Sequence, residues 1–254
     1  MKFQVERDVL AEAVAWAART LPARPAQPML AGILIEADKN SLTLSAFDYE
    51  VSSRVSIEAG ISESGKVLVS GKLFADISRS LPNQPVVGTV NGSRLEIKCG
   101  KANFALPTLP PDDYPTLPPL PKTSGSAKAK VFAESVAQVA VAAGRDESLP
   151  MLTGIRVEIE GNTITLAATD RYRLAVKEFS WNPNDPKIST AALVPARTLA
   201  EGAKGFLNSN EILISLASDK DRLMGFEGEG TTNNIGLVCI ESGSFRIKTH
   251  FGLF

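Results

Sequence analysis

The sequence predicts an α+β fold made of two copies of one unit, joined by a proline-rich connector. Three observations support this prediction. The chain repeats itself at a fixed offset, each copy contains an amphipathic helix followed by alternating apolar segments, and a cluster of prolines separates the copies. The length of 254 residues is sufficient for two domains, each with its own hydrophobic core.

The repeat is the strongest of these observations. The segment Pro28–Ile33 returns as Pro150–Ile155, an offset of 122 residues, and about 17 of the 40 pairs over residues 9–48 are identical. Further along, Val69–Asp76 matches Val194–Glu201 at an offset of 125, which indicates that a loop of the second copy has gained three residues. We therefore expect each element of the first copy to have a counterpart in the second.

Each copy is predicted to begin with a helix whose apolar residues share one face: Leu10, Val14, Ala17 and Leu21, then Phe132, Val136, Val139 and Ala143. Alternating segments around turns then predict two hairpins: Ile33–Glu36 with Leu42–Ala46, and Ile155–Glu158 with Ile164–Ala168. A further strand precedes a second helix in each copy: Lys66–Val69 before Lys72–Leu81, and Ala192–Val194 before Arg197–Gly205. The first copy closes with the hairpin Arg94–Lys98 and Ala102–Leu106, turned at Gly100, and Ile212–Leu216 begins its counterpart.

The segment Leu106–Lys130 contains seven prolines and then a Thr-Ser-Gly-Ser run, so we interpret it as an interdomain connector. The predicted organisation is a first domain over residues 1–121, the end of the connector over 122–130, and a second domain over 131–230. Residues 231–254 contain no proline and do not follow the repeat, which predicts an atypical tail with a possible strand at Ser244–Phe251.

Composition excludes several classes of function. The formal net charge of −1 argues against binding nucleic acid by bulk electrostatics, so any such contact must be local, weak or topological. His250 is the only histidine, and Cys99 and Cys239 are far apart in sequence; we predict free thiols, no metal site and no cofactor. The N-terminus lacks the apolar stretch of a signal peptide, and no apolar run could cross a bilayer, so a cytoplasmic location is predicted.

No catalytic motif is recognisable, because the chain has neither a phosphate-binding loop nor a histidine placed for a triad. Asp48 and Asp170 are equivalent by the repeat, and such paired carboxylates could do acid–base work. Aspartates at strand ends usually cap turns, and we favour that structural role here. The sequence predicts a protein that is not an enzyme.

Two groups of residues could bind partners. The segment Thr169–Ala175 contains two arginines and a tyrosine, whereas its equivalent, Phe47–Ser53, contains neither arginine. The segment is either an exposed charged strand or a binding surface. Basic residues gather at the ends of the predicted helices: Arg19, Arg24, Lys72, Arg79, Arg145, Arg197 and Lys204. They could complement helix dipoles, which suits Arg19 and Arg79, or make sequence-blind contacts with DNA phosphates.

Several separated motifs resemble the bacterial DNA polymerase III β subunit, the sliding clamp: Met1–Phe3, Arg24–Leu30, Phe104–Pro110 and Thr169–Val176. They occur in order over residues 1–230. The resemblance implies the DNA clamp fold, in which each chain has three such domains and two chains form a ring around duplex DNA. It also implies that helices line the inner face, that antiparallel sheets form the outer wall, and that the ring tethers the replicative polymerase.

The resemblance further assigns roles to individual positions. It implies that the DNA-facing residues are Arg24, Lys72, Arg79 and Arg197. It places a pocket for peptides from the polymerase III α subunit, the clamp loader and other partners at Leu152, Thr169, Arg171, Tyr172, Arg173 and Leu174. Phe104 and Leu106 match the edge at which two subunits form the homodimer.

The chain departs from the family where the third domain should be. We therefore expect a truncated chain that cannot close a ring, with a shifted reading frame near Thr231 as the hypothesis. Three functions are open at this stage. They are a non-catalytic processivity clamp, a fragment that binds clamp-binding peptides without encircling DNA, and an enzyme that would need a cofactor the sequence does not offer.

Overall fold

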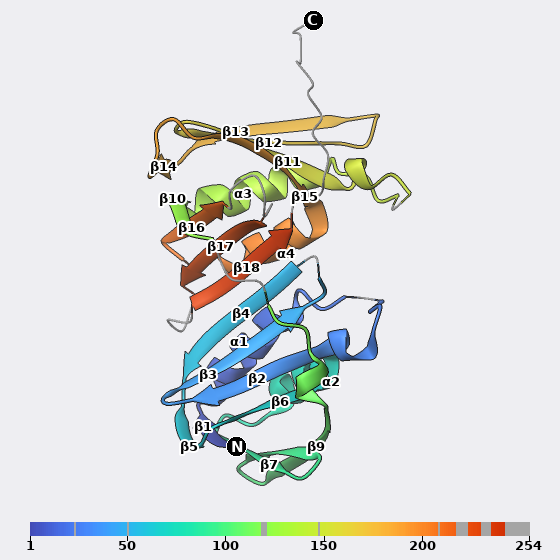
Figure 1. Cartoon of the computed structure of the whole chain (residues 1–254), viewed down its shortest axis with the longest axis vertical. Helices are drawn as coiled ribbons and strands as arrows, with labels where there is room; N and C mark the ends of the chain where they lie inside the picture. Colours follow the sequence, from blue (N-terminus) through green and yellow to red (C-terminus); the bar gives the residue numbers. More distant parts are fainter. Residues whose placement is uncertain are drawn as a thin grey trace, which may run out of the picture.

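The computed structural model describes residues 1–22, 24–49, 51–117, 121–146, 148–207, 209–216, 223–229 and 235–241 (Figure 1). The predicted duplication is present, since both domains contain two helices and antiparallel strands in the same order. The first domain contains β1 (Lys2–Val5), α1 (Arg7–Ala18), η1 (Pro28–Ala31), β2 (Gly32–Asp38), β3 (Ser41–Phe47), β4 (Val51–Glu58), β5 (Gly60–Glu63), β6 (Gly65–Ser70), α2 (Gly71–Ser80), β7 (Val86–Asn91), β8 (Arg94–Cys99) and β9 (Ala102–Leu109).

The connector contains a short helical turn, η2 (Pro111–Asp113). The second domain contains β10 (Thr123–Lys128), α3 (Ala129–Ala140), η3 (Pro150–Leu152), β11 (Gly154–Glu160), β12 (Thr163–Thr169), β13 (Leu174–Ser180), β14 (Asn182–Pro183), β15 (Ser189–Pro195), α4 (Ala196–Gly205), β16 (Glu211–Leu216), β17 (Leu223–Glu229) and β18 (Ile235–Glu241).

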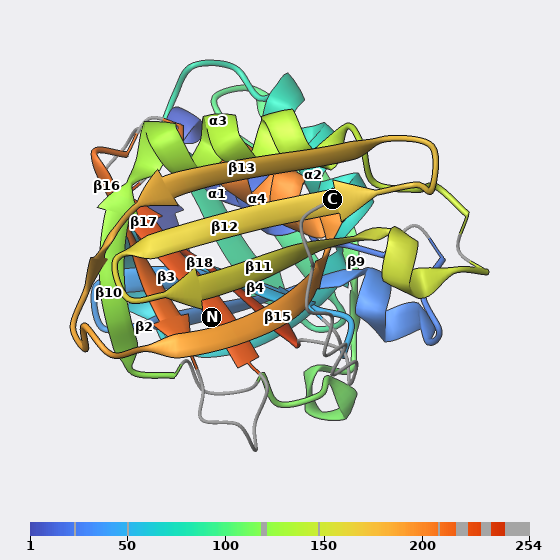
Figure 2. The same ribbon diagram turned by 90° about the horizontal axis from the view of Figure 1, so that it is seen from above.

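Helices and sheets occupy opposite sides of the molecule. The helices α1 and α2 lie behind β2, β3 and β4 in Figure 1, and the view along the long axis places the helices of both domains on the same side (Figure 2). Below, this side is called the helix face. The connector crosses the opposite side of the first domain, because Tyr114 packs on Leu34, Phe47 and Leu68, whereas the alternate residues of β2 face the core under α1 and α2.

The predicted helix faces are largely correct. Leu10, Val14 and Ala17 are buried in the core of the first domain, and Phe132, Val136 and Val139 are buried in the core of the second. The helices end earlier than expected, at Ala18 and Ala140, so the two remaining predicted positions, Leu21 and Ala143, follow the helices and are only half-buried.

Besides the connector, contacts between the described parts of the two domains include a strand ladder and a contact between helices. In the ladder, β18 pairs antiparallel with β4 from Ile235 opposite Ser56 to Ile240 opposite Val51. Through this ladder, strands of both domains form one continuous sheet, and the strands β13, β12, β11 and β15 form a second sheet. Between the helices, the Trp16 ring of α1 meets the Phe206 ring after α4 at 5.0 Å between centroids.

The prediction that residues 122–130 end the connector is wrong. This segment forms β10 and the start of α3, and β10 pairs with β16 inside the second domain. The buried positions of β10 are Gly125 and Ala127, which are too small to give an apolar signal in the sequence. Gly125 is required there, because a Cβ would lie 2.5 Å from the Trp181 ring.

The sequence did not predict β18, which lies within the segment expected to be an atypical tail. The strand expected at Ser244–Phe251 lies outside the described residues.

Candidate functional site

A cleft of about 470 Å³ opens at one end of the second domain. Its wall is formed by the loop after α3, by η3 and by the turn between β12 and β13. The lining residues are Ala143, Gly144, Arg145, Asp146, Leu149, Leu152, Asp170, Arg171, Tyr172 and Arg173. Four of the six predicted pocket residues are therefore in this wall, and the sequence did not single out the contribution of the loop 143–149.

The β12–β13 turn is held by the Asp170 carboxylate. Its Oδ1 accepts the backbone N–H groups of Tyr172 and Arg173, both at 3.1 Å, and its Oδ2 accepts Arg173 Nε at 2.9 Å. Desolvation opposes ionisation of Asp170, but the hydrogen bonds from Tyr172 and Arg173 outweigh it and lower the pKa of this carboxyl. Asp48 has the same capping role in the first domain, where its Oδ1 accepts Val51 N–H at 2.7 Å.

These contacts confirm the structural interpretation of the two aspartates. The residue after each aspartate has a positive φ, 74° for Tyr49 and 81° for Arg171, although neither is glycine. Such a backbone costs about 1–2 kcal/mol for an L-residue, so the repeat keeps a strained turn at the same position of both domains.

The strained turn presents side chains to solvent. Tyr172 is 90% exposed and Leu174 is 59% exposed, while Leu152 is half-buried in the wall of the cleft. Thr169 does not line the cleft; its hydroxyl donates to the carbonyl of Arg173 at 2.7 Å and accepts the Arg171 N–H at 3.2 Å. Thr169 therefore orders the turn that displays Tyr172. Leu174 lies just outside the cleft, at the start of β13.

The exposed cations of the second helices follow the repeat. Lys72 lies in the first turn of α2, and Arg197 occupies the equivalent position of α4, 125 residues later. A helix dipole disfavours cations in the first turn, so complementing the dipole cannot explain these two residues. Within the described part of the chain, neither side chain has a carboxylate within 4.0 Å.

Arg79 and Lys204 are equivalent residues in the last turns of α2 and α4. Both are paired with a carboxylate three residues earlier, Arg79 with Asp76 at 2.8 Å and Lys204 with Glu201 at 2.7 Å. The dipole argument from the sequence suits this pair, since a cation near a helix C-terminus is stabilising.

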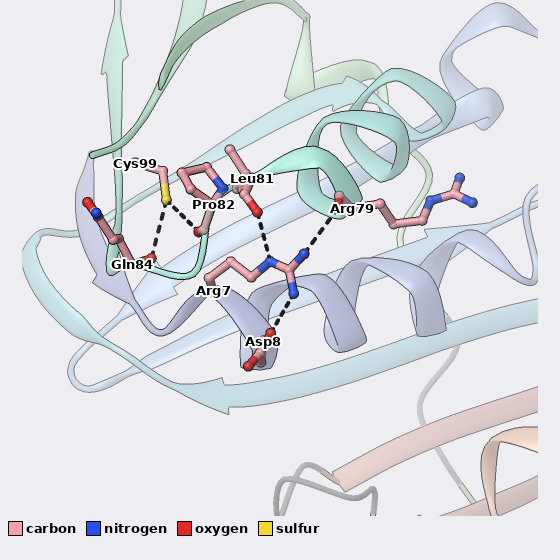
Figure 3. A network of polar contacts seen from close by, with 7 residues as sticks. All are labelled: Arg7, Asp8, Arg79, Leu81, Pro82, Gln84 and Cys99. Carbon is pink, nitrogen blue, oxygen red and sulfur yellow. Dashed lines mark hydrogen bonds and ion pairs between the residues drawn. The ribbon is translucent and has the colours of Figure 1, made fainter. Parts of the chain in front are cut away.

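Arg7 fixes the end of α2 against the start of α1 (Figure 3). Its guanidinium donates to the carbonyl of Leu81 and to that of Arg79, both at 3.1 Å, and pairs with Asp8 at 2.6 Å. These carbonyls belong to the helix end that lacks intrahelical partners. Nearby, the thiol of Cys99 is buried and lies 3.2 Å from the carbonyls of Pro82 and Gln84.

The other predicted residues are not grouped with these helices. Arg24 is exposed in the segment between α1 and η1. Leu106 is 0% exposed and belongs to the core of the first domain, so its side chain offers no surface to a second subunit, and Phe104 is half-buried against the same core. Among the described strands, β9 pairs with β8 along one edge and with β6 only at Thr108 and Leu109 of the other. The strand edge, rather than the Leu106 side chain, is available for pairing.

The described residues contain neither a candidate membrane span nor a candidate metal-binding cluster. No helix in this part of the chain is long and apolar enough to span a membrane. The same residues contain no group of three or more histidine, cysteine or acidic side chains with the spacing of a metal site.

Comparisons with known proteins identify the family. Residues 1–118 match the N-terminal domain of the DNA polymerase III beta subunit, and residues 126–239 match its central domain, so the central-domain match includes part of β18. The beta sliding clamp of Streptomyces coelicolor is 56% identical over 240 residues, which are 94% of this chain and 64% of that protein. The beta sliding clamp of Micrococcus luteus is 49% identical over 238 residues, 94% of this chain and 76% of that protein.

The fold agrees with a solved structure. The crystal structure of the DNA polymerase sliding clamp from Bacillus subtilis superimposes with a TM-score of 0.84 at 24% identity, over 98% of this chain and 67% of that chain. The predicted α+β clamp fold is therefore confirmed. With both domain matches and relatives of this identity, the chain belongs to the DNA polymerase III beta-subunit family, the sliding clamps.

Proposed function

We propose that this chain acts as part of a DNA polymerase processivity clamp, a non-catalytic accessory protein that holds duplex DNA against its helix face in the cytoplasm. One observation carries the proposal: the second helices of both domains lie on the helix face (Figure 2), and the first turn of each contains a cation, Lys72 or Arg197, with no carboxylate within 4.0 Å among the described residues. The position is unfavourable for the helix itself, so a phosphate backbone outside the helix gives the cation a role. With a net charge of −1, contacts of this kind are local and weak.

Binding to linear duplex DNA at low salt tests the helix face. Lys72→Ala and Arg197→Ala are each expected to reduce affinity about two- to fivefold and to lower the slope of log K against log salt by about 1, as expected when one phosphate contact is lost. Neither change should reduce the melting temperature, because each removes a cation that the helix dipole disfavours in the first turn. Fluorescence anisotropy over a salt series measures both quantities. Lys98→Ala, on β8, is the control, and equal affinity of all four proteins contradicts the proposed DNA contact.

We further propose that the cleft of the second domain receives short extended peptides from polymerases and clamp loaders. The exposed Tyr172 ring, the apolar Leu152 and the arginines at positions 145, 171 and 173 form a surface with an apolar floor and a charged rim. Such a surface suits a peptide with hydrophobic residues and one or two acidic groups.

Tyr172→Ala is expected to weaken the binding of a synthetic clamp-binding peptide at least tenfold, because exposed aromatic side chains at such sites commonly contribute ~2 kcal/mol. The matched control is Tyr49→Ala, which removes an exposed tyrosine from the equivalent turn of the first domain. Isothermal titration calorimetry provides the affinities. If both variants bind like the unsubstituted chain, the peptide site is elsewhere.

Pairing of two subunits would use the open edge of β9 around Phe104, with backbone hydrogen bonds rather than the buried Leu106 side chain. The alternative function is a protein-interaction fragment that binds such peptides without encircling DNA. The two functions separate in the experiments above, since the alternative predicts that Tyr172→Ala acts on peptide binding while Lys72→Ala and Arg197→Ala leave DNA binding unchanged.

A further inference from the structure

We propose that Asp76 and Glu201 are charge-moderating residues of the helix face: each pairs with a cation and reduces its attraction for DNA. This inference rests on the proposed function, and it also makes Lys204 a further DNA-facing residue. It accounts for an arrangement that neither the repeat nor helix stability explains fully.

The second helix of each domain contains two kinds of cation, in the same order in both domains. In the first turn, Lys72 and Arg197 have no carboxylate partner in the part of the chain that the structure describes, and in the last turn Arg79 and Lys204 are paired. The pairs have the same spacing and nearly the same length, 2.8 Å for Asp76–Arg79 and 2.7 Å for Glu201–Lys204. The residue types differ: the first domain pairs an aspartate with an arginine, and the second pairs the longer glutamate with a lysine. What the two copies share is the ion pair, not the side chains that form it.

The contribution of these pairs to helix stability is small. All four side chains are substantially exposed, from 40% for Glu201 to 69% for Arg79, and exposed ion pairs three residues apart contribute little to helix stability. The pairs also change how each cation attracts a nearby phosphate, because a cation within 3 Å of a carboxylate presents a dipole to its surroundings rather than a full charge. Dipolar attraction falls off faster with distance than the attraction of a full charge, and at physiological salt it is largely screened beyond about 8 Å.

The pairing also restrains the cations. The Arg79 guanidinium donates Nε to the carbonyl of Ala75 at 3.1 Å as well as Nη2 to Asp76. The Lys204 ammonium is held by Glu201 at the same turn of α4. A phosphate must therefore compete with a carboxylate for each of these donors, which keeps each contact short-lived. On each second helix, one free cation and one moderated cation attract DNA without fixing its position, as sliding requires.

Neutralising the two acids tests this inference. Asp76→Asn and Glu201→Gln keep the size of each side chain and remove its charge. Each is expected to increase the affinity of the chain for linear duplex DNA about two- to fivefold at low salt, and the double variant should approach the product of the two. The slope of log K against log salt should become steeper, because two cations become free to displace counterions.

The controls make the same chemical changes on the opposite side of the molecule. Asp112→Asn, in η2, neutralises the acid that pairs with Lys66. Glu158→Gln, on β11, neutralises the acid that pairs with Arg156, and the Glu158 side chain is as exposed as that of Glu201. Both change the net charge by the same amount but should leave the salt slope unchanged. Adding Arg79→Ala to Asp76→Asn should cancel the gain, since the gain depends on the released guanidinium.

The outcomes separate the two proposals. If Lys72→Ala and Arg197→Ala weaken DNA binding but neutralising the acids does not strengthen it beyond the controls, the moderating role is wrong and the DNA contact stands. If neutralising the acids weakens binding, the carboxylates position Arg79 and Lys204 instead of moderating them, which also overturns this inference. If none of these variants changes binding, the proposed function itself fails.

Discussion

Trp16→Ala is expected to uncouple the unfolding of the two domains and to destabilise the chain by about 3 kcal/mol, the lower end for removing a large aromatic side chain from a packed site. The reason is the position of Trp16 in α1, where its ring meets Phe206 edge to face at an interplanar angle of 66°. Phe206 is 1% exposed, so the alanine leaves a cavity between the domains. Calorimetry is expected to show one transition for the unsubstituted chain and two for the variant.

A substitution at Gly205 tests the same contact between the two domains more specifically. Replacing glycine by alanine inside a helix normally stabilises by roughly 0.5–1 kcal/mol. Here a Cβ on Gly205 would lie 1.7 Å from Cζ3 of Trp16, so Gly205→Ala is expected to destabilise the chain that contains Trp16. In the Trp16→Ala background the clash is gone, and the same change should stabilise. A Gly205→Ala change with the same sign in both backgrounds would show that the two residues are not in contact.

Tyr114→Ala is expected to cost about 3 kcal/mol and to release the connector from the first domain. The Tyr114 ring covers Leu34, Phe47 and Leu68, and its hydroxyl oxygen accepts the Phe47 N–H at 2.8 Å. Tyr114→Phe keeps the ring and leaves that N–H without its partner, which should cost about 1–2 kcal/mol. Limited proteolysis between the domains should be faster for the alanine variant than for the phenylalanine variant.

The same tyrosine predicts a pH dependence. Burial, opposed by the hydrogen bond from Phe47 and reinforced by the charge of Asp48, raises the pKa of Tyr114 to about 12 from its ordinary value of 10.0. The neutral phenol is therefore favoured in the folded state, and its contribution is complete below pH 10 and is lost as pH rises from 10 to 12. Denaturant unfolding at pH 9 and pH 11 should show this loss, and Tyr114→Phe should remove it. Tyr172→Phe, at an exposed hydroxyl, should leave the pH dependence unchanged.

The sequence by itself determined the features that depend on local periodicity. The offset between Pro28–Ile33 and Pro150–Ile155 shows the duplication, and the spacing of Leu10, Val14 and Ala17 shows which side of a helix is buried. Hairpins follow from alternation around turns. Family resemblance added the positions of the cleft residues, because motifs such as Asp170–Leu174 are contiguous in the chain. Each of these signals is contained in a few neighbouring residues.

Tertiary structure decided the features that depend on which distant residues meet. Nothing near Gly205 in sequence indicates that Trp16 fills the space of its missing side chain, and nothing near Tyr114 indicates that it covers Phe47. The strand β10 was not predicted, because its buried residues are small. Leu106 is a core residue because β9 directs that side chain inward. The pairing of charges depends on the fold too. Lys72 and Arg79 are both basic residues of one helix, but only the fold shows that, among the described residues, Arg79 pairs with a carboxylate and Lys72 does not. Pairing depends on side-chain direction in three dimensions, which a linear pattern does not contain.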